Sequence, residues 1–421
     1  MPARCRLLFK EALLVTGKTA RGRIDASISR EAPAGEAARL LAALRDLAPE
    51  FTARSKEIEE GRRVPSDIAD KLRHLGLFRT MMPRSLGGLE LNAAEVAPMI
   101  ETMAAADSSI GWMTMIYITS AIFTTRAPRA VLERIFLQDP DAILAGSGAP
   151  AGQAEKINGS YRVSGRWPFV SGCQNAQWIG GHFVICKDGQ PVMSEQGPQS
   201  RFFVLPADRW QIEDTWRASG LTGTGSHHVA LENVEVPEQD VFDLFQGKSS
   251  VPGPLETAIF PFSASFHAAV AVGIAAGATA ELAAVAGSGR RQLFAATDIK
   301  DSPIVQHEFG RLNAVLRAAR ALTQTQAEDQ WRRALEGTLD NKADLAEGLQ
   351  GSAWVHAACT EVVSGCYTLG GSSSIMNTSP LQRRLRDIHA ARQHFFAQER
   401  LYGAAGKNAL GFPPVDPISG Q

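Results

Sequence analysis

Apolar positions recur every three or four residues through the first third of the chain. Residues 38–51 (ARLLAALRDLAPEF) and 66–78 (SDIADKLRHLGLF) place charged residues between such positions, which is the spacing of an amphipathic helix. A long run with few charges follows at 93–123 and predicts a buried helical segment. The pattern therefore predicts a helical domain over residues 31–140, preceded by a mobile extension over residues 1–30.

The pattern changes at Asp141 to short segments rich in Val, Ile, Phe and Trp, separated by Gly, Pro, Asn and Asp. Such segments predict a compact antiparallel β domain over residues 141–252. Long helical patterns return over residues 253–410, and residues 411–421 form a tail. A helical chain interrupted once by strands indicates an α+β fold rather than a parallel α/β sheet.

Charge and cysteine content exclude several classes of function. The chain has 421 residues, with 43 basic and 44 acidic side chains and a formal net charge of -1. This balance argues against nucleic acid or an anionic membrane as the main partner. Five scattered cysteines without a CxxC spacing predict neither a disulfide framework nor a zinc cluster, and they suit a reducing cytoplasm.

Two histidines lie close together near the C-terminus, in the stretch RDIHAARQHFFAQER at 386–400. In a continuous helix, His389 and His394 would point about 140° apart, so they could not share a metal ion without other ligands. No H-E-x-x-H motif or set of carboxylates accompanies them, and we predict no metal site. One histidine is expected to face a bound molecule, while the other packs or hydrogen-bonds within the structure.

Four strings, in this order, resemble the acyl-CoA dehydrogenase superfamily over about residues 40–405: GRWPFVSGCQNAQW (165–178), GLTGTGSHHVALENVEVPEQDVF (220–242), RQLFAATDIKDSPIVQHEFGRL (291–312) and YTLGGSSSIMNTSPLQRRLRDIHAARQH (367–394). The resemblance implies an N-terminal helical domain, a central antiparallel β domain and a C-terminal four-helix bundle.

The last helix separates two branches of this superfamily. Dehydrogenases most often carry a catalytic glutamate, in a Glu-Gly-Thr setting, shortly after the Arg-Asp pair. Here Arg386-Asp387 is followed by His394 and two phenylalanines. The pattern Arg-Asp-x-His-Ala-x-x-x-His is instead similar to the oxygenase component of two-component flavin-dependent monooxygenases (group D).

That resemblance implies a specific activity and specific partners. The protein is expected to bind diffusible reduced flavin, FMNH2 or FADH2, from a separate NAD(P)H-flavin reductase, since no nicotinamide-binding βαβ unit is visible. It would react with O2 through a flavin hydroperoxide and hydroxylate a small aromatic or heteroatom-containing substrate. A homotetramer is expected.

Two alternatives remain open from the sequence. An acyl-CoA dehydrogenase with a relocated base would bind oxidised, yellow FAD tightly. A non-catalytic scaffold of the same fold would have no affinity for flavin in either redox state.

The resemblance also assigns catalytic candidates. His394 is the expected general base, and His389 is the other candidate. Ser147 and Ser171 stand beside glycines at strand ends, where hydroxyl groups could donate to flavin N5 or to the peroxide. Ser-Gly pairs also simply mark turns.

Further residues are expected around the cofactor and the substrate. Trp167 and Phe169 alternate on one strand face and either cover the flavin ring or pack in the core. His227 and His228 are interpreted as structural. The remaining candidates are Gly172, Thr224 and Ser226 beside the flavin; Arg290, Arg291 and Gln306 reaching the cofactor of a neighbouring subunit; Gly370 and Gly371 in a closing loop; and Trp112 and Tyr117 facing the substrate.

Overall fold

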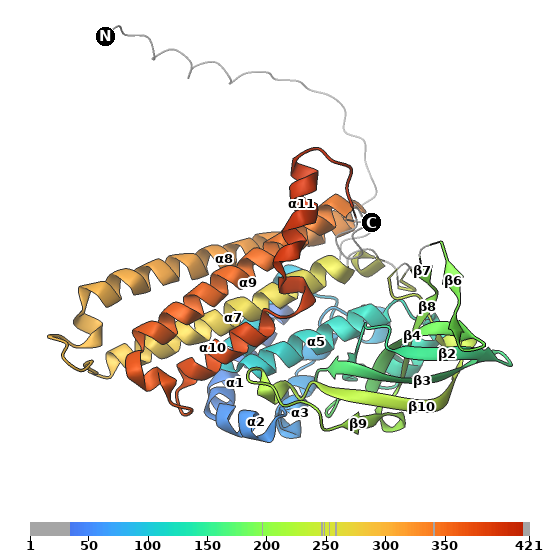
Figure 1. Cartoon of the computed structure of the whole chain (residues 1–421), viewed down its shortest axis with the longest axis horizontal. Coiled ribbons are helices and arrows are strands. Elements are labelled where there is room, and N and C mark those ends of the chain that lie inside the picture. Colours follow the sequence, from blue (N-terminus) through green and yellow to red (C-terminus); the bar gives the residue numbers. More distant parts are fainter. Residues whose placement is uncertain are drawn as a thin grey trace, which may run out of the picture.

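The computed structural model describes residues 34–415, except 196, 246, 248, 252, 257, 258, 340 and 341. Helices precede and follow a single β domain, as the hydrophobic pattern predicts (Figure 1). The predicted extension at 1–30 and the end of the tail lie outside the described residues. The α+β, acyl-CoA dehydrogenase-like fold class is confirmed.

The N-terminal helices are α1 (Ala34–Ala53), α2 (Ser55–Gly61), α3 (Ser66–His74), α4 (Ala93–Ala106), α5 (Ser108–Thr124) and the short α6 (Arg129–Leu132). A capping box begins α4, since the Asn92 side chain accepts from Glu95 N and the Glu95 carboxylate accepts from Asn92 N. Asp107 caps α5 in a similar way, by accepting from the backbone N–H groups of Ser109 and Ile110. These caps fix the start of α5, which is buried along nearly its whole length and reaches the candidate site.

The β domain contains one main sheet with the order β1-β4-β2-β3-β10-β9, with β5 and β8 also pairing with β4. Its strands are β1 (Leu144–Gly146), β2 (Gly152–Ile157), β3 (Ser160–Val170), β4 (Trp178–Lys187), β5 (Gln190–Pro191), β8 (Ser200–Pro206), β9 (Gln211–Glu213) and β10 (His227–Pro237). A small ribbon pairs β6 (Met193–Ser194) with β7 (Gly197–Pro198). The β1–β4 and β2–β4 pairs are parallel, so the predicted antiparallel domain is in fact a mixed sheet.

The C-terminal bundle consists of α7 (Ile259–Gly287), α8 (Pro303–Leu335), α9 (Lys342–Leu369) and α10 (Pro380–Ala391), followed by α11 (Tyr402–Ala409). Helix α7 packs against α4, α5, α8, α9 and α10 (Figure 1). Within the described residues, α7 is the one helix with the length and composition of a membrane span, and 67% of its most apolar window is buried inside the protein. Its apolar composition is therefore explained by its place in the core of the bundle.

Candidate active site

A cavity of ≈ 700 Å³ lies where the bundle meets the β domain. Helix α5, the start of α7 and the segment after α10 form one side, and β1, β4, β8 and the end of β3 form the other. The wall is largely aromatic and aliphatic. It includes Trp112, Ile116, Phe123, Leu144, Phe169, Phe202, Trp216, Leu244, Phe245, Phe260, Phe395 and Phe396, with Ser147, Ser171, Thr224, Ser226, His267 and His394 among its polar members.

A chain of hydrogen-bonded side chains runs along this wall. Trp112 Nε1 donates to Ser171 Oγ at 3.2 Å. Ser171 Oγ lies 2.7 Å from Ser226 Oγ, which in turn lies 2.7 Å from Thr224 Oγ1. Thr224 Oγ1 lies 2.8 Å from the backbone oxygen of Leu221. All four side chains are buried, so the structure brings the predicted Trp112, Ser171, Thr224 and Ser226 together in one site.

The end groups fix the direction of this chain. A carbonyl oxygen only accepts, so Thr224 donates to Leu221, Ser226 donates to Thr224, and Ser171 donates to Ser226. The indole of Trp112 only donates, so Ser171 accepts from it. Ser171 therefore has one lone pair left for a ligand. The sequence prediction gave this hydroxyl as a donor, whereas the network makes it an acceptor.

Ser147, unlike Ser171, has a hydroxyl proton that is free to donate a hydrogen bond into the cavity. Its hydroxyl oxygen accepts from the backbone N–H of Ala149 at 3.4 Å, and its O–H has no acceptor among the described residues. The side chain is partly exposed and lines the cavity. It is therefore available as a donor, as the sequence predicts.

The two aromatic residues predicted to share a strand face point to different places. Phe169 lines the cavity, whereas Trp167 is fully buried in the β domain, where it donates to the backbone oxygen of His182. The register between β3 and β10 shifts at this point, so that Pro168 and Phe169 both oppose His228. This bulge breaks the alternation on which the prediction for Trp167 depended.

Phe169 also has an unusual backbone and an exposed ring. Its φ is +59°, in the left-handed region that bulky residues rarely adopt, and its side chain is 67% exposed. Neither feature is expected of a side chain that serves only to pack. The structure thus favours Phe169, and not Trp167, as a residue that covers a bound ring.

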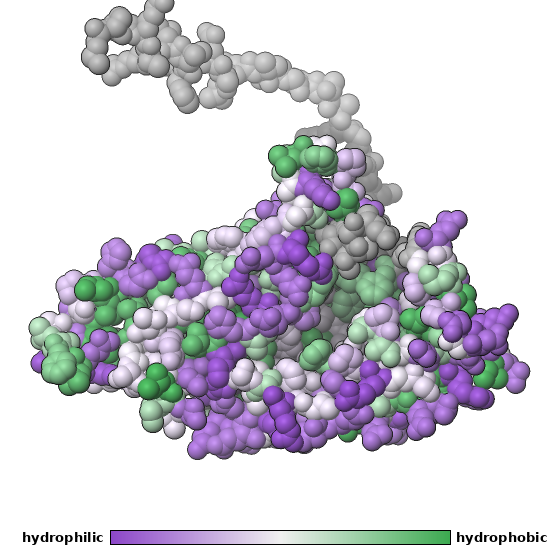
Figure 2. Space-filling view, in the orientation of Figure 1, coloured by the Kyte–Doolittle hydropathy of each residue, from purple (hydrophilic) through white to green (hydrophobic). Residues whose placement is uncertain are grey.

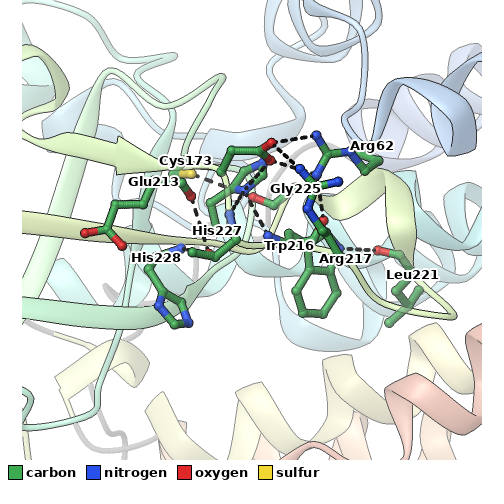
Figure 3. Close-up of polar contacts among 11 residues, drawn as sticks. Arg62, Cys173, Glu213, Trp216, Arg217, Leu221, Gly225, His227 and His228 are labelled. Atoms are coloured by element: carbon green, nitrogen blue, oxygen red, sulfur yellow. Dashed lines mark hydrogen bonds and ion pairs between the residues drawn. The ribbon is translucent and has the colours of Figure 1, made fainter.

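The loop before β10 is held from two sides. His227 Nδ1 accepts from the backbone N–H groups of Thr215 and Trp216, each at 3.2 Å (Figure 3). Arg62 Nη1 donates to Asp214 at 2.7 Å, and this bond lowers the pKa of the Asp214 carboxyl. These contacts position Trp216 in the cavity wall, and they agree with the structural interpretation of His227.

The same loop is anchored from the bundle by Asp387. Its carboxylate accepts from the backbone N–H of Leu221 at 2.7 Å. A side chain at Gly220 would lie 2.1 Å from the backbone oxygen of Arg386, so only glycine allows this close approach. Burial raises the pKa of Asp387 to about 6. The Arg-Asp pair of the sequence motif therefore acts by holding the loop that carries Thr224 and Ser226.

The two C-terminal histidines are not in one helix. Helix α10 ends at Ala391, so His389 lies on its exposed face while His394 follows the helix. His394 lines the cavity, and His389 does not. The structure therefore places His394 inward, as the sequence predicts, whereas the side chain of His389 points to solvent and away from the cavity in which it was expected to act.

His394 also caps a short helical turn, η10 (Phe395–Ala397). Its Nδ1 accepts from Phe396 N at 3.3 Å, which leaves the proton of the neutral ring on Nε2. Burial lowers the pKa of His394 to about 4. A neutral imidazole whose basic nitrogen is occupied offers an N–H donor. The structure therefore favours His394 as a hydrogen-bond donor over the predicted general base.

A second histidine, which the sequence analysis missed, stacks on the first. The rings of His267 and His394 lie 4.0 Å apart and nearly parallel, and Trp112 meets both edge-on at 5.2 and 5.5 Å. His267 lines the cavity from α7. A signal was present, because His267 and Glu281 are the only ionisable residues in that otherwise apolar helix.

Tyr117 was predicted to face the substrate, and this prediction is wrong. Tyr117 is buried beside the cavity, its ring packs edge-on against Phe78, and its hydroxyl donates to the backbone oxygen of Gly172 at 3.0 Å. Gly172 has φ +74°, and a side chain there would collide with this hydroxyl. Gly172 N donates to Thr224 O, so both residues support the site without lining it.

The remaining predicted cofactor residues lie at the other end of the bundle, about 30 Å along α7 from His267 at 1.5 Å per residue. They do not line the cavity of their own chain. Arg291 pairs with Asp298, and Gln292 Nε2 donates to Leu369 O, next to Gly370 and Gly371. Ile299 N donates to Arg290 O, and Gln306 Nε2 donates to Lys300 O, so both residues lie beside the connection between α7 and α8, which Figure 1 shows at its left end. Their expected contact with a neighbouring subunit stays a prediction.

Near the stacked pair, α9 buries a third histidine, His356. Neither of its ring nitrogens makes a hydrogen bond of ordinary geometry, although the ring lies near the backbone of His267. Burial lowers the pKa of His356 to about 3. In the unfolded chain, the pKa of this histidine is about 6.5. The stability linked to His356 is therefore complete above pH 6.5 and is lost as the pH falls toward 3.

Replacing His356 by leucine is expected to stabilise the protein by about 1–3 kcal/mol at pH 7, because a buried group without hydrogen bonds is removed. The loss of stability between pH 6.5 and 5 should become smaller, although His267 and His394, whose pKa values burial also lowers, still contribute to it. Asp387 acts the other way, since its raised pKa lowers stability as the pH rises from about 4 to 6. Thermal unfolding at several pH values tests this, and equal pH dependence in the two proteins would contradict it.

Comparison with known proteins agrees with this arrangement. The family models described as acyl-CoA dehydrogenase, N-terminal domain, and acyl-CoA dehydrogenase, C-terminal domain, match residues 35–126 and 265–399. The chain is 32% identical to indole-3-acetate monooxygenase of Pseudomonas putida, over 93% of this chain and 96% of that protein. It is 30% identical to the flavin-dependent monooxygenase oxygenase subunit HsaA of Mycobacterium tuberculosis, over 90% and 98%.

A solved structure shows the same fold. XiaF from Streptomyces sp., in complex with FADH2 and glycerol, superimposes with a TM-score of 0.83 at 25% identity, covering 90% of this chain and 98% of XiaF. The fold and site thus define a member of the acyl-CoA dehydrogenase superfamily. Within it, the chain belongs to the flavin-dependent monooxygenases and is an oxidoreductase.

Proposed function

We propose that this protein is the oxygenase component of a two-component system. It binds FMNH2 or FADH2 that a separate NAD(P)H-flavin reductase releases by diffusion. With O2, it transfers one oxygen atom to a small aromatic or heteroatom-containing substrate. When bound, the reduced flavin supplies the oxygen chemistry, and the protein supplies orientation, hydrogen bonds and a dry cavity.

The observation that carries this proposal is the direction of the hydrogen-bond chain at Ser171. Reduced flavin has an N–H group at N5, whereas oxidised flavin has a lone pair there. A hydroxyl group that offers only a lone pair matches the N–H and repels the oxidised form. The site therefore suits a flavin that arrives already reduced.

Other wall residues fit the same cofactor and reaction. Phe169 can cover the flavin ring, and the aromatic wall excludes water. Ser147 and His394 each offer a donor toward the cavity, where oxygen develops negative charge during transfer. These donors are held in place by contacts to the backbone, so little reorganisation is needed.

The wall argues against the dehydrogenase alternative. Among the described residues that line the cavity, none is Asp or Glu, so the carboxylate that removes an α-proton has no counterpart. His394, with its basic nitrogen occupied by Phe396 N–H, is a poor replacement for it.

We also propose that the protein is a homotetramer, in which the distal end of each bundle completes the flavin site of a neighbour. Leu293 and Phe294 are 85% and 98% exposed beside Arg291, and Phe294 has φ +65°. Figure 2 shows apolar surface at this left end of the bundle. Exposed apolar side chains next to arginines suit contact with another subunit and with the flavin phosphate.

The dissociation constants of reduced and oxidised flavin test the proposal. Anaerobic titration should show that reduced FMN or FAD binds at least about tenfold more tightly than the oxidised form. The reduced form gains a hydrogen bond to Ser171 where the oxidised form meets repulsion, and one hydrogen bond accounts for about this factor. Tighter binding of oxidised FAD, with bleaching by an acyl thioester, would support the dehydrogenase instead. No affinity for flavin in either state would support the scaffold.

A further inference from the structure

We infer that the substrate is an uncharged aromatic molecule of one or two rings, whose single polar group forms a hydrogen bond with His267. This inference rests on the proposed function and names the substrate class for the same cavity. Two independent features carry it, the lack of charge in the described wall and the unused hydrogen-bonding capacity of His267.

The described part of the wall contains no charged side chain. Its polar members are hydroxyl groups, Gln393 and two histidines. Arg126 lies next to the wall, with its guanidinium 5.9 Å from the Phe260 ring and donating to Leu244 O, but it does not line the cavity. A substrate carboxylate inside the cavity would lose its hydration without gaining a cation from the described part of the wall.

The histidines do not supply the missing positive charge. His267 and His394 stack face to face at 4.0 Å, so the two rings cannot both carry a positive charge without strong repulsion. Burial and this neighbour hold the pKa of His267 well below its ordinary value. Both rings are neutral at physiological pH, and a neutral imidazole offers one donor and one acceptor.

His267 has no hydrogen-bond partner for its ring among the described residues. The side chain is 3% exposed, and its Nδ1 is fully enclosed by protein, so Nε2 is the ring nitrogen that a ligand in the cavity can meet. A polar group buried in a helix core without a partner is rare, and it calls for a group that completes it. A ligand beside His394 and Trp112 would bring such a group to the ring.

The shape of the surroundings selects flat ligands. Trp112 and Phe396 lie 5.2 and 5.1 Å from the His267 ring centre, and Phe245 stacks on Phe260 at 5.7 Å on the same wall. Aromatic edges and faces of this kind favour an aromatic ligand over an aliphatic chain of equal size. The aromatic wall gives affinity, and His267 gives orientation.

The first test compares indole with indole-3-acetate, which differ by one carboxymethyl group. Both are titrated into the flavin-free protein and into the anaerobic complex with reduced FMN. We expect indole to bind at least about tenfold more tightly, because only the acid must bury a charge. Equal or tighter binding of indole-3-acetate overturns the inference.

The second test uses His267→Phe and His267→Leu with indole and benzofuran, which has the shape of indole but no N–H. The wild-type protein should prefer indole by about tenfold, and both variants should lose this preference while binding benzofuran unchanged. Thermal unfolding shows whether each variant is folded. An unchanged preference for indole in a folded variant, or an equal loss of both ligands, contradicts the role of His267.

These tests are separable from the proposed function. Ligand selection is measured without oxygen and also without flavin, so it can fail in a protein that binds reduced flavin normally. Conversely, a protein with no affinity for reduced flavin disproves the proposed function even when indole is preferred.

Discussion

Substituting asparagine for His394 should lower the rate of product formation about 10²-fold, while glutamine at the same position should keep it within about tenfold of the wild type. The amide nitrogen of glutamine occupies roughly the place of Nε2 in histidine and still donates. Asparagine reaches only the place of Nδ1, where it can accept from Phe396 N and preserve the cap. The pair therefore separates loss of the cavity donor from loss of the local structure.

The same pair distinguishes a donor from a general base. A base role requires an imidazole, so both variants would be equally inactive. It would also give a pH profile with a step near the pKa of the base. Burial lowers the pKa of His394 to about 4, and the ring donates from Nε2 whether it is neutral or protonated, so the donor role predicts a rate that changes little between pH 5 and 8. Single-turnover product formation at several pH values measures this, and a step near pH 6.5 that His394→Gln abolishes would contradict the donor role.

Replacing Ser171 by alanine should weaken the binding of reduced flavin about tenfold and leave the binding of oxidised flavin unchanged or improved. The variant loses the acceptor that matches N5–H, and most of the oxygen consumed should then be released as hydrogen peroxide rather than transferred to substrate. Anaerobic titration and the ratio of product to peroxide measure both effects.

Two further substitutions show whether the whole chain of hydroxyls matters. Ser226→Ala removes the acceptor for the hydroxyl proton of Ser171, which is then free to turn toward the flavin. The difference in affinity between reduced and oxidised flavin should therefore fall, although Ser171 is still present. Ser263→Ala is the matched control, because Ser263 lines the same cavity but donates to Ile259 O in its own helix. If Ser226→Ala behaved like the control, the direction assigned to the chain would be wrong.

The hydrophobic pattern predicted the fold because each element is long or strongly periodic and has clear boundaries. The sequence also placed Ser171, Thr224 and Ser226 in the site, since glycines mark their turns, and the family resemblance placed Trp112 there from its position on the helix over 108–123. It could not give the direction of their hydrogen bonds. That direction depends on the backbone oxygen of Leu221, which no sequence motif reports.

The site residues that the sequence misplaced or missed each have a local physical explanation. A bulge in β3 separated Trp167 from Phe169, although a period of two put them on one face. Neither proline nor glycine occurs between 386 and 400, so the end of α10 before His394 was hidden. His267 was overlooked because a histidine in an apolar helix is often only a core residue. The hydroxyl of Tyr117 was already used by Gly172, a contact between segments 55 residues apart.

The reoxidation of bound reduced flavin by dissolved oxygen tests the central claim most directly. The protein is loaded with reduced FMN or FAD without oxygen and mixed rapidly with 18O2, with and without an aromatic substrate. A walled cavity with donors from Ser147 and His394 predicts that the absorbance of oxidised flavin returns only after a lag. It also predicts that a turned-over substrate gains one 18O atom. Immediate reoxidation at the rate of free flavin, with all the oxygen recovered as hydrogen peroxide, would contradict it.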